Sequence, residues 1–307
     1  MEGRLFRYGR GAANVAFMSG RHPRHVIMIG GLTDGLLFAP YCRPLAARLE
    51  DERWSLVQTL LSSSHAGYGT ASLDQDADEL HQLATCLKEE HGSQGVVILG
   101  HSTGCQDAVR YCQRHRASAD AAPLLGAVLQ APVSDVEWFA TNPPTAERLA
   151  LARAMVEQGK GEEIAFRIKE YDGAAITARR WLALAEPGGD DDMFSSALSD
   201  AQLGSIFGAM VGLPTLVLLS GAEECVASQD EYRAQGQRIV QAIGAGARLR
   251  IVKGAAHALN GKEEEGSAAI TACVATLGPP LVSRDDEQRN DGGGGGPPGG
   301  RCGCVVS

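Results

Sequence analysis

Short apolar runs alternate with helix-like patterns along most of this chain. The runs are rich in Val, Ile and Leu, whereas the segments between them place apolar residues three and four positions apart. Strands that are covered on both faces read as continuous apolar runs, so this alternation predicts an α/β fold with a mostly parallel central sheet and helices on both faces. The predicted parallel strands cover residues 26–29, 56–61, 96–99, 127–129, 216–219 and 249–252.

Other segments carry local signals of their own. Residues 5–8 and 15–18 are expected to form an opening antiparallel hairpin. Ser72 can cap a helix whose apolar positions recur at helical spacing until Gly92, which favours a helix end. A second clear helical pattern covers residues 229–243. These elements fit between the predicted strands.

Composition divides the chain into a folded part and a tail. Its 307 residues, 44% of them hydrophobic, are enough to bury a sizeable core. We expect one domain over residues 1–280, with a helical cap at about 133–213, where the strand-helix alternation breaks. Residues 281–307 turn to charge, Gly and Pro, a composition that cannot form a packed core and predicts a disordered tail.

Charge and cysteine usage exclude several classes of function. The net charge of −9 leaves no basic stripe for a phosphate backbone, so nucleic acid is not an expected partner. The first 20 residues carry no secretory signal, and no apolar stretch is long enough to span a bilayer. Six of the eight cysteines are scattered among apolar residues, which indicates buried, reduced thiols in the cytoplasm.

The pattern G-x-S-x-G occurs at residues 100–104, directly after a predicted strand and before a predicted helix. A serine on such a tight turn needs small neighbours, and the helix that follows directs its positive end toward the serine. This context predicts Ser102 as a nucleophile and the backbone N–H of Thr103 as an oxyanion donor. A chance Gly-rich turn is the alternative, which the flanking strand and helix disfavour. His101, next to the nucleophile, is expected to pack rather than to act as the base.

A serine hydroxyl needs an imidazole base that a carboxylate orients. In this type of chain the order is serine, acid, histidine. His257 follows the last predicted strand and is the only histidine after residue 115, so it is the expected base. Glu223 and Glu224 both follow the strand at 216–219 and both stay open as the acid. Leu32, in the Gly-rich turn after the strand at 26–29, is the expected second oxyanion donor.

Other polar groups give weaker signals. No complete Gly-rich phosphate loop is present, so no nucleotide cofactor is expected. The acidic run 190–192 could attract a cation, but no spaced ligand set accompanies it, and a solvated loop is the favoured interpretation. The Ser- and Gly-rich loop 62–69 fits either a pocket wall or a plain turn. We therefore expect neither a cofactor nor a metal.

Several longer blocks resemble a known family. They are residues 29–35, 54–58, 62–67, 99–107, 129–135 and 190–196. Over about residues 3–277 the chain resembles the plant and fungal α/β-hydrolase family of domain-of-unknown-function type 1749, also described as UPF0613-like. The resemblance implies the α/β-hydrolase fold and ester hydrolysis, with siderophore esters associated with some fungal relatives, and leaves the substrate open.

The family pattern near the acid reads D-E-Y-V-P. Aligning its valine with Val226 places its aspartate at Glu223, so the resemblance implies Glu223 rather than Glu224 as the acid. Here Glu replaces Asp, and Ala227 replaces the proline. The first hypothesis is a carboxylic ester hydrolase that forms an acyl-serine with a small-molecule or lipid-like ester. A catalytically silent binding or scaffold protein, and an acyltransferase or thioesterase with the same triad, are the alternatives.

The tail carries one motif. Residues 304–307, Cys-Val-Val-Ser, match C-a-a-X, which predicts prenylation of Cys304. One prenyl chain binds membranes weakly, and Cys302 is placed to carry a palmitoyl group as a second anchor. The expectation is a cytoplasmic protein tethered to a membrane surface. Nothing in the sequence predicts the oligomeric state.

Overall fold

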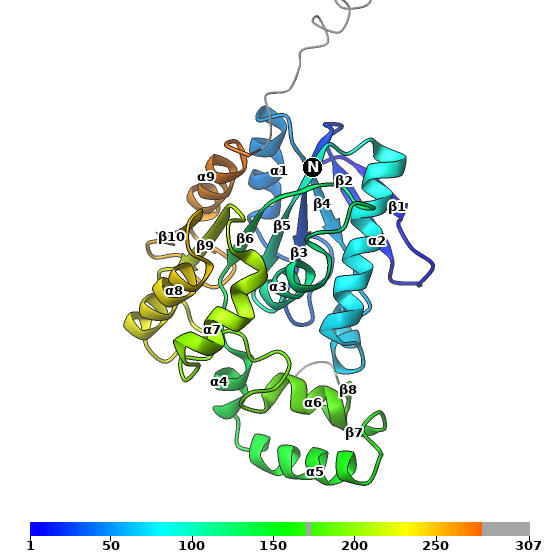
Figure 1. The fold of residues 1–307 in the computed structure, drawn as a ribbon, viewed down its shortest axis with the longest axis vertical. Coiled ribbons are helices and arrows are strands. Elements are labelled where there is room, and N and C mark those ends of the chain that lie inside the picture. Colours follow the sequence, from blue (N-terminus) through cyan, green and yellow to red (C-terminus); the bar gives the residue numbers. More distant parts are fainter. Residues whose placement is uncertain (170–172, 278–307) are drawn as a thin grey trace, which may run out of the picture. The chain divides into compact units, whose positions relative to one another are not determined.

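An eight-stranded sheet forms the centre of the computed structural model, which describes residues 1–169 and 173–277 (Figure 1). The strand order is β1-β2-β4-β3-β5-β6-β9-β10, and all neighbours from β4 to β10 run parallel. The mostly parallel sheet is therefore confirmed. The strands are β1 (Arg4–Arg7), β2 (Val15–Ser19), β3 (Arg24–Ile29), β4 (Ser55–Thr59), β5 (Gly95–His101), β6 (Leu124–Gln130), β9 (Thr215–Ser220) and β10 (Ala247–Val252).

Helices cover both faces of this sheet, as predicted. Successive side chains of a strand point to opposite faces, and β3 shows this directly. Val26 and Met28 pack with the residues of α1 (Cys42–Asp51) and α9 (Glu263–Val274). Ile27 and Ile29 pack in the other core. That second core also includes α2 (Leu73–His91), α3 (Gly104–His115), α7 (Asp200–Phe207) and α8 (Gln229–Ile243).

The local signals for α2 and for the hairpin are confirmed. Ser72 caps α2, its side chain accepting a hydrogen bond from the backbone N–H of Gln75 at 3.2 Å. Gly92 ends the helix with φ of +62°, a left-handed conformation that glycine adopts without a steric penalty. Strands β1 and β2 pair antiparallel. The predicted helix at 229–243 matches α8.

Strand β10 departs from the expectation that every apolar run is covered on both faces. It lies at the edge of the sheet, and Arg248 and Arg250 alternate outward along it. An edge strand pairs on one side only and tolerates polar side chains there. Its apolar residues Leu249 and Ile251 still pack against the core.

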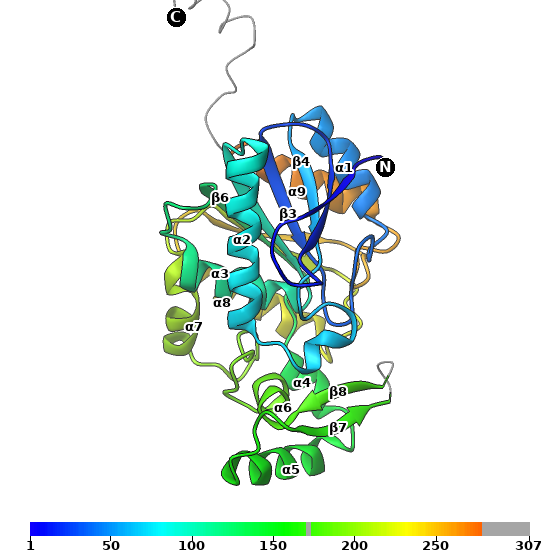
Figure 2. The ribbon, with the colours of Figure 1, turned by 90° about the vertical axis from the view of Figure 1, so that its right-hand side faces the viewer.

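The segment between β6 and β9 contains its own small core. It holds α4 (Asp135–Ala140), α5 (Thr145–Glu157), β7 (Ile164–Ile168), β8 (Ala174–Thr177) and α6 (Ala178–Ala185), which lie together at one end of the sheet (Figure 2). Trp181 is fully buried there, with edge-to-face ring contacts to Phe139 at 5.0 Å and Phe166 at 5.1 Å. Residues of α7, in contrast, belong to the core of the main sheet.

The antiparallel pair β7 and β8 is absent from the sequence expectation, which reads the segment as a mostly helical cap. Both strands are short, at five and four residues, so their alternation is too brief to stand out from a helical pattern. The tail, with the predicted lipidation sites Cys302 and Cys304, lies outside the described residues. Among the described residues, no helix has the length and apolar character that crossing a membrane requires.

Candidate active site

Ser102 lies on the turn between β5 and α3, with φ of +54°. A non-glycine residue rarely adopts this conformation, so the turn holds backbone strain. Its glycines are required by space: a Cβ on Gly100 would lie 2.2 Å from the carbonyl oxygen of Gly104, and one on Gly104 would lie 2.6 Å from that of Gly30. The backbone N–H of Ser102 donates to Gln130 at 3.0 Å. The strand-turn-helix context predicted for the pattern is present.

The loop after β3 lies directly against the nucleophile. A Cβ on Gly31 would lie 2.7 Å from Cβ of Ser102, so only glycine lets this loop approach so closely. Oδ2 of Asp34 accepts the Gly31 N–H at 2.7 Å and holds the loop in place. Over residues 1–169 and 173–277, the backbone N–H groups of Leu32 and Thr103 donate no hydrogen bond to a protein acceptor. Both are available to a developing oxyanion.

His257 lies beside both predicted carboxylates, and the two make different contacts. Nδ1 of His257 lies 2.8 Å from Oε1 of Glu223, which is 2% exposed. Oε2 of Glu224 instead accepts the backbone N–H of His257 at 2.8 Å. Glu223 therefore contacts the imidazole, whereas Glu224 holds the loop that carries it.

A cavity of about 310 Å³ brings Ser102, Leu32 and His257 together, and we call it the Ser102 cavity; Glu223 lies behind His257, and Thr103 lines a second cavity described below. It is lined by Gly31, Leu32, Asp34, Phe38, His101, Ser102, Val133, Asp135, Trp138, Cys225, His257 and Ala258. Ser102 and His257 face the same space, although no hydrogen bond joins them within the described part of the chain. Such contacts often tighten only when substrate binds.

The environment of His257 changes its proton affinity. Burial lowers the pKa of His257, but contacts with the side chains of Cys225 and Glu223, and their charges, raise this pKa to about 10. The imidazolium is therefore stabilised by the same carboxylate that orients the ring. A base of this kind becomes neutral only toward alkaline pH.

Gln130 links His101, Tyr41 and the loop of His257 through hydrogen bonds of its side chain. The sequence analysis assigns it no role. Its Oε1 accepts from the hydroxyl of Tyr41 at 3.2 Å and contacts Nδ1 of His101. Its Nε2 donates to the carbonyl oxygen of His257 at 3.0 Å. Burial lowers the pKa of His101 to about 3, so this ring stays neutral. The one sequence signal was a polar residue at the end of an otherwise apolar strand.

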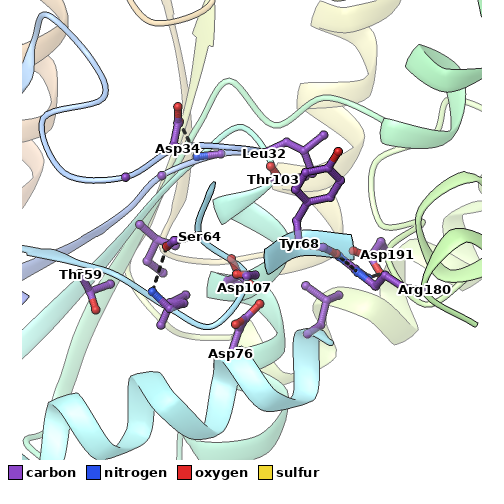
Figure 3. A pocket seen from close by; sticks show the side chains of 17 residues that line it. Leu32, Asp34, Thr59, Ser64, Tyr68, Asp76, Thr103, Asp107, Arg180 and Asp191 are labelled. Atoms are coloured by element: carbon purple, nitrogen blue, oxygen red, sulfur yellow. Dashed lines mark hydrogen bonds and ion pairs between the residues drawn. The ribbon is translucent and has the colours of Figure 1, made fainter. Parts of the chain in front are cut away.

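A second, smaller cavity of about 30 Å³ also borders the Leu32 loop, and we call it the Asp107 cavity (Figure 3). Gly31, Leu32 and Asp34 line both cavities. The Asp107 cavity is also lined by Asp76, Asp107 and Asp191. Arg180 is the one cationic residue among the described residues that line this cavity. Arg180 pairs with Asp191 at 2.5 Å and donates to the backbone of Tyr68 at 2.8 Å.

The carboxyl groups around this cavity hold their protons more tightly than usual. Burial raises the pKa of Asp76 to about 7, against the lowering effect of its hydrogen bonds with Ser63. Burial, and then the charges of Asp76 and Asp191, raise the pKa of Asp107 well above its ordinary value. Asp135 lines the Ser102 cavity instead, and burial and the charge of Asp191 raise its pKa to about 8.

The solvated loop predicted for residues 190–192 is wrong. Asp191 is 2% exposed and paired with Arg180, and Asp192 is 8% exposed and accepts from the backbone N–H of Gly188 at 2.8 Å. Only Asp190 is partly open, and it pairs with Arg110. The loop 62–69 combines the two roles considered for it. Ser63 and Ser64 line the Asp107 cavity, and Ser64 Oγ also accepts the backbone N–H of Leu61 at 3.0 Å.

Four of the cysteines are buried, as expected, but Cys225 is half-buried and lines the Ser102 cavity. Among the described residues, two groups of three side chains could hold a metal ion. One is Glu223, Cys225 and His257, and the other is Cys86, Glu90 and His91. The sequence analysis treats Cys225 as core because a single cysteine shows no partner in the sequence.

Comparisons with known proteins agree with this geometry. A family model described as "Protein of unknown function (DUF1749)" matches residues 2–277. The chain is 34% identical over 256 residues to Fusarinine C esterase sidJ of Aspergillus fumigatus, covering 67% of this chain and 72% of that protein. It is 30% identical over 241 residues to Esterase AN6793 of Emericella nidulans, covering 62% and 64%. The solved structure of the siderophore hydrolase EstB from Aspergillus fumigatus matches with a TM-score of 0.70 at 27% identity, covering 89% of this chain and 95% of that one.

Proposed function

Because the chain belongs to the DUF1749 family of α/β hydrolases and is an esterase-type hydrolase, we propose that it cleaves carboxylic esters through an acyl-serine on Ser102. The observation that carries this proposal is the buried carboxylate of Glu223, 2.8 Å from Nδ1 of His257, in a site whose cavity also exposes Ser102.

The proposed reaction has two halves. Oγ of Ser102 attacks the ester carbonyl while His257 takes its proton, and the N–H groups of Leu32 and Thr103 stabilise the oxyanion. The bond to the alcohol oxygen then breaks, and His257 returns the proton to the leaving alcohol. Water, deprotonated by His257, attacks the acyl-serine; the bond to Oγ of Ser102 then breaks, His257 returns the proton to Oγ, and the acid is released. Glu223 orients the imidazole throughout.

The first test compares wild type with Ser102→Ala in the turnover of p-nitrophenyl esters. Loss of the nucleophile should lower kcat by at least about a thousandfold, because the oxyanion donors alone retain only residual catalysis. Ser134→Ala serves as the matched control: Ser134 is a buried hydroxyl that contacts Ser195 at 2.8 Å and caps α4. Unchanged turnover in Ser102→Ala would refute the acyl-serine proposal.

We propose a small-molecule or lipid-like ester as substrate, because aromatic and aliphatic side chains line much of the Ser102 cavity. Leu32, Phe38, Val133 and Trp138 supply this apolar wall. Siderophore esters and fusarinine C are substrates to test, since one similar fungal protein is named a siderophore hydrolase and another a fusarinine C esterase. The same residues would serve a thioesterase or an acyltransferase. A panel of acyl esters and acyl thioesters, with and without an added alcohol acceptor, separates these activities.

We propose that the segment at 133–213 acts as a cap that sets selectivity. Val133 and Trp138 from this segment line the Ser102 cavity, and Leu32 packs against its core. Replacing residues 133–213, which include Val133 and Trp138, by the corresponding segment of a relative should change the preferred acyl chain while Ser102 still reacts with a fluorophosphonate. An unchanged substrate range would contradict this role.

Prenylation of Cys304, with Cys302 as a second acylation site, stays a proposal that rests on the sequence. The test is membrane fractionation and intact mass of wild type against Cys304→Ser after expression in a eukaryotic cell. An added isoprenoid mass and membrane binding that Cys304→Ser loses would support the tether. A wild type without that mass, equally soluble with and without Cys304, would exclude it.

A further inference from the structure

Three different ligand atoms meet beside the Ser102 cavity, which two of their residues, Cys225 and His257, line. A carboxylate oxygen of Glu223, the sulfur of Cys225 and a ring nitrogen of His257 all lie within 4.8 Å of one another. Oxygen, sulfur and nitrogen from these residue types are the ligands that Zn²⁺ takes in proteins. Zinc forms bonds of about 2.0 to 2.3 Å, so ligand atoms on one tetrahedral ion lie about 3.3 to 3.8 Å apart. Small side-chain shifts would bring this group to that size.

The carboxylate of Glu223 keeps one oxygen unused. Its Oε1 contacts Nδ1 of His257 and accepts the backbone N–H of Cys225 at 3.1 Å. Its Oε2 is buried and has no hydrogen-bond partner among the described residues. A buried carboxylate oxygen without a partner is costly, and a cation in contact with it would remove that cost.

The group can also be reached from outside. Cys225 and His257 are half-buried and line the Ser102 cavity, whose volume is about 310 Å³. The other three-ligand group, Cys86, Glu90 and His91, lies at the end of α2 and lines none of the cavities described above. It therefore provides an internal comparison on the same protein.

We propose that Glu223, Cys225 and His257 form a binding site for a zinc-type divalent cation that reversibly inhibits the enzyme. The binding part stands on the ligand geometry alone, whereas inhibition rests on the proposed esterase function. Neutral imidazole has two ring nitrogens, one protonated and one free. If the metal takes Nε2, the base is blocked directly. If it takes Nδ1, the ring proton stays on Nε2, which then cannot accept the proton of Ser102.

Binding is tested with Co²⁺, because a thiolate ligand gives cobalt a characteristic near-ultraviolet charge-transfer band. Wild type, Cys86→Ala and Cys273→Ala should show this band at one equivalent, and Cys225→Ala should lose it. Cys273, half-buried on α9, is the matched control. Losing a hydrogen-bond partner of a ligand weakens metal binding by about 10- to 100-fold, so losing the thiolate itself should weaken it by at least about 100-fold. A band that survives in Cys225→Ala would overturn the proposal.

Alkylation of the wild type gives a readout that needs no variant. Zinc should slow the reaction of iodoacetamide with Cys225 at least about tenfold, because the metal occupies the thiolate, and should leave Cys273 unaffected. Mass spectrometry of the two peptides measures both rates. Equal alkylation of Cys225 with and without zinc would overturn the site.

Inhibition is then measured as the ratio of ester turnover with and without zinc, each variant against its own zinc-free rate. Wild type and Cys273→Ala should lose turnover and regain it with a chelator, whereas Cys225→Ala should need at least about 100-fold more zinc. If the wild type has no esterase activity, the proposed function fails, while cobalt binding and alkylation still decide the site. Active enzyme that zinc does not inhibit would refute the inhibitory role.

Discussion

The Ser102 cavity and the Asp107 cavity share the Leu32 loop as a wall, but the buried carboxyl groups beside them have different partners. In the first, the buried carboxylate of Glu223 has a titratable partner, His257, and the space is large enough for a substrate. In the second, Asp76, Asp107 and Asp191 face a single cation, Arg180, around a space of about 30 Å³. In the proposed mechanism the first pair moves a proton, whereas the second cluster holds protons and places Asp191 and Arg180 next to Asp76 and Asp107.

The largest expected effect is on Glu223. Glu223→Gln should lower kcat by about 10³- to 10⁴-fold, because an amide stabilises neither the required tautomer nor the imidazolium. Glu224→Gln is the matched control and should cost less than about tenfold, since Glu224 contacts only the backbone of His257. Ester turnover of the two purified variants measures this, and equal losses would remove the distinction between the two carboxylates.

Arg180 tests the second cluster. Arg180→Met should lower the free energy of unfolding by about 3 to 5 kcal/mol, because it leaves Asp191 buried without its partner. Arg114→Met is the control: Arg114 pairs with the exposed carboxylates of Asp74 and Asp78, and its loss should cost less than about 1 kcal/mol. Urea denaturation of both variants decides. A similar small cost for both would show that Arg180 does not hold the cluster.

Stability should also depend on pH through Asp135, a buried carboxyl group of the Ser102 cavity that feels the charge of Asp191. Burial raises the pKa of Asp135 to about 8, so the folded state binds a proton that the unfolded state, with a pKa near 3.8, has lost. The free energy of unfolding should therefore fall as pH rises from about 4 to about 8, by on the order of a few kcal/mol from this group. Asp135→Asn should flatten that fall. Denaturation at a series of pH values measures it, and an unchanged slope would contradict the assignment.

The smallest expected effect concerns the pH dependence of turnover. Contacts with Cys225 and Glu223 raise the pKa of His257, so kcat/KM should increase with pH into the alkaline range, where the base becomes neutral. Cys225→Ala removes one of the raising contacts and should move the midpoint to lower pH, by about one pH unit, whereas Cys273→Ala should not. A midpoint that stays in place in Cys225→Ala would show that Cys225 does not affect the base.

The two regions also differ in how far the sequence predicts them. The fold and the turn at Ser102 rest on local patterns, namely apolar runs and glycines whose missing Cβ atoms leave room for neighbouring backbone. The acid cluster does not: whether Asp191 is solvated or buried depends on Arg180 and on Tyr68, which come from different segments. The sequence therefore predicts a solvated loop where the structure has a buried ion pair.

Which loop residue contacts the ring of His257 is the feature that is hardest to predict from the sequence. Cys225 resembles the buried cysteines by its neighbours in the sequence, and only the loop geometry brings it to His257. In the same way, Glu223 and Glu224 are equivalent until one contacts the ring and the other the backbone. The two glutamates make different contacts because the side chains of adjacent loop residues point in different directions.

The central claim is that Ser102, and no other hydroxyl, becomes acylated, with His257 as its base and Glu223 as the carboxylate that orients His257. The most direct measurement is peptide mapping by mass spectrometry after reaction of the native protein with a fluorophosphonate. We predict a single adduct on the peptide that contains Ser102, formed at least about 100-fold more slowly in Glu223→Gln. An adduct on another residue, or a native protein that forms none, would contradict the account.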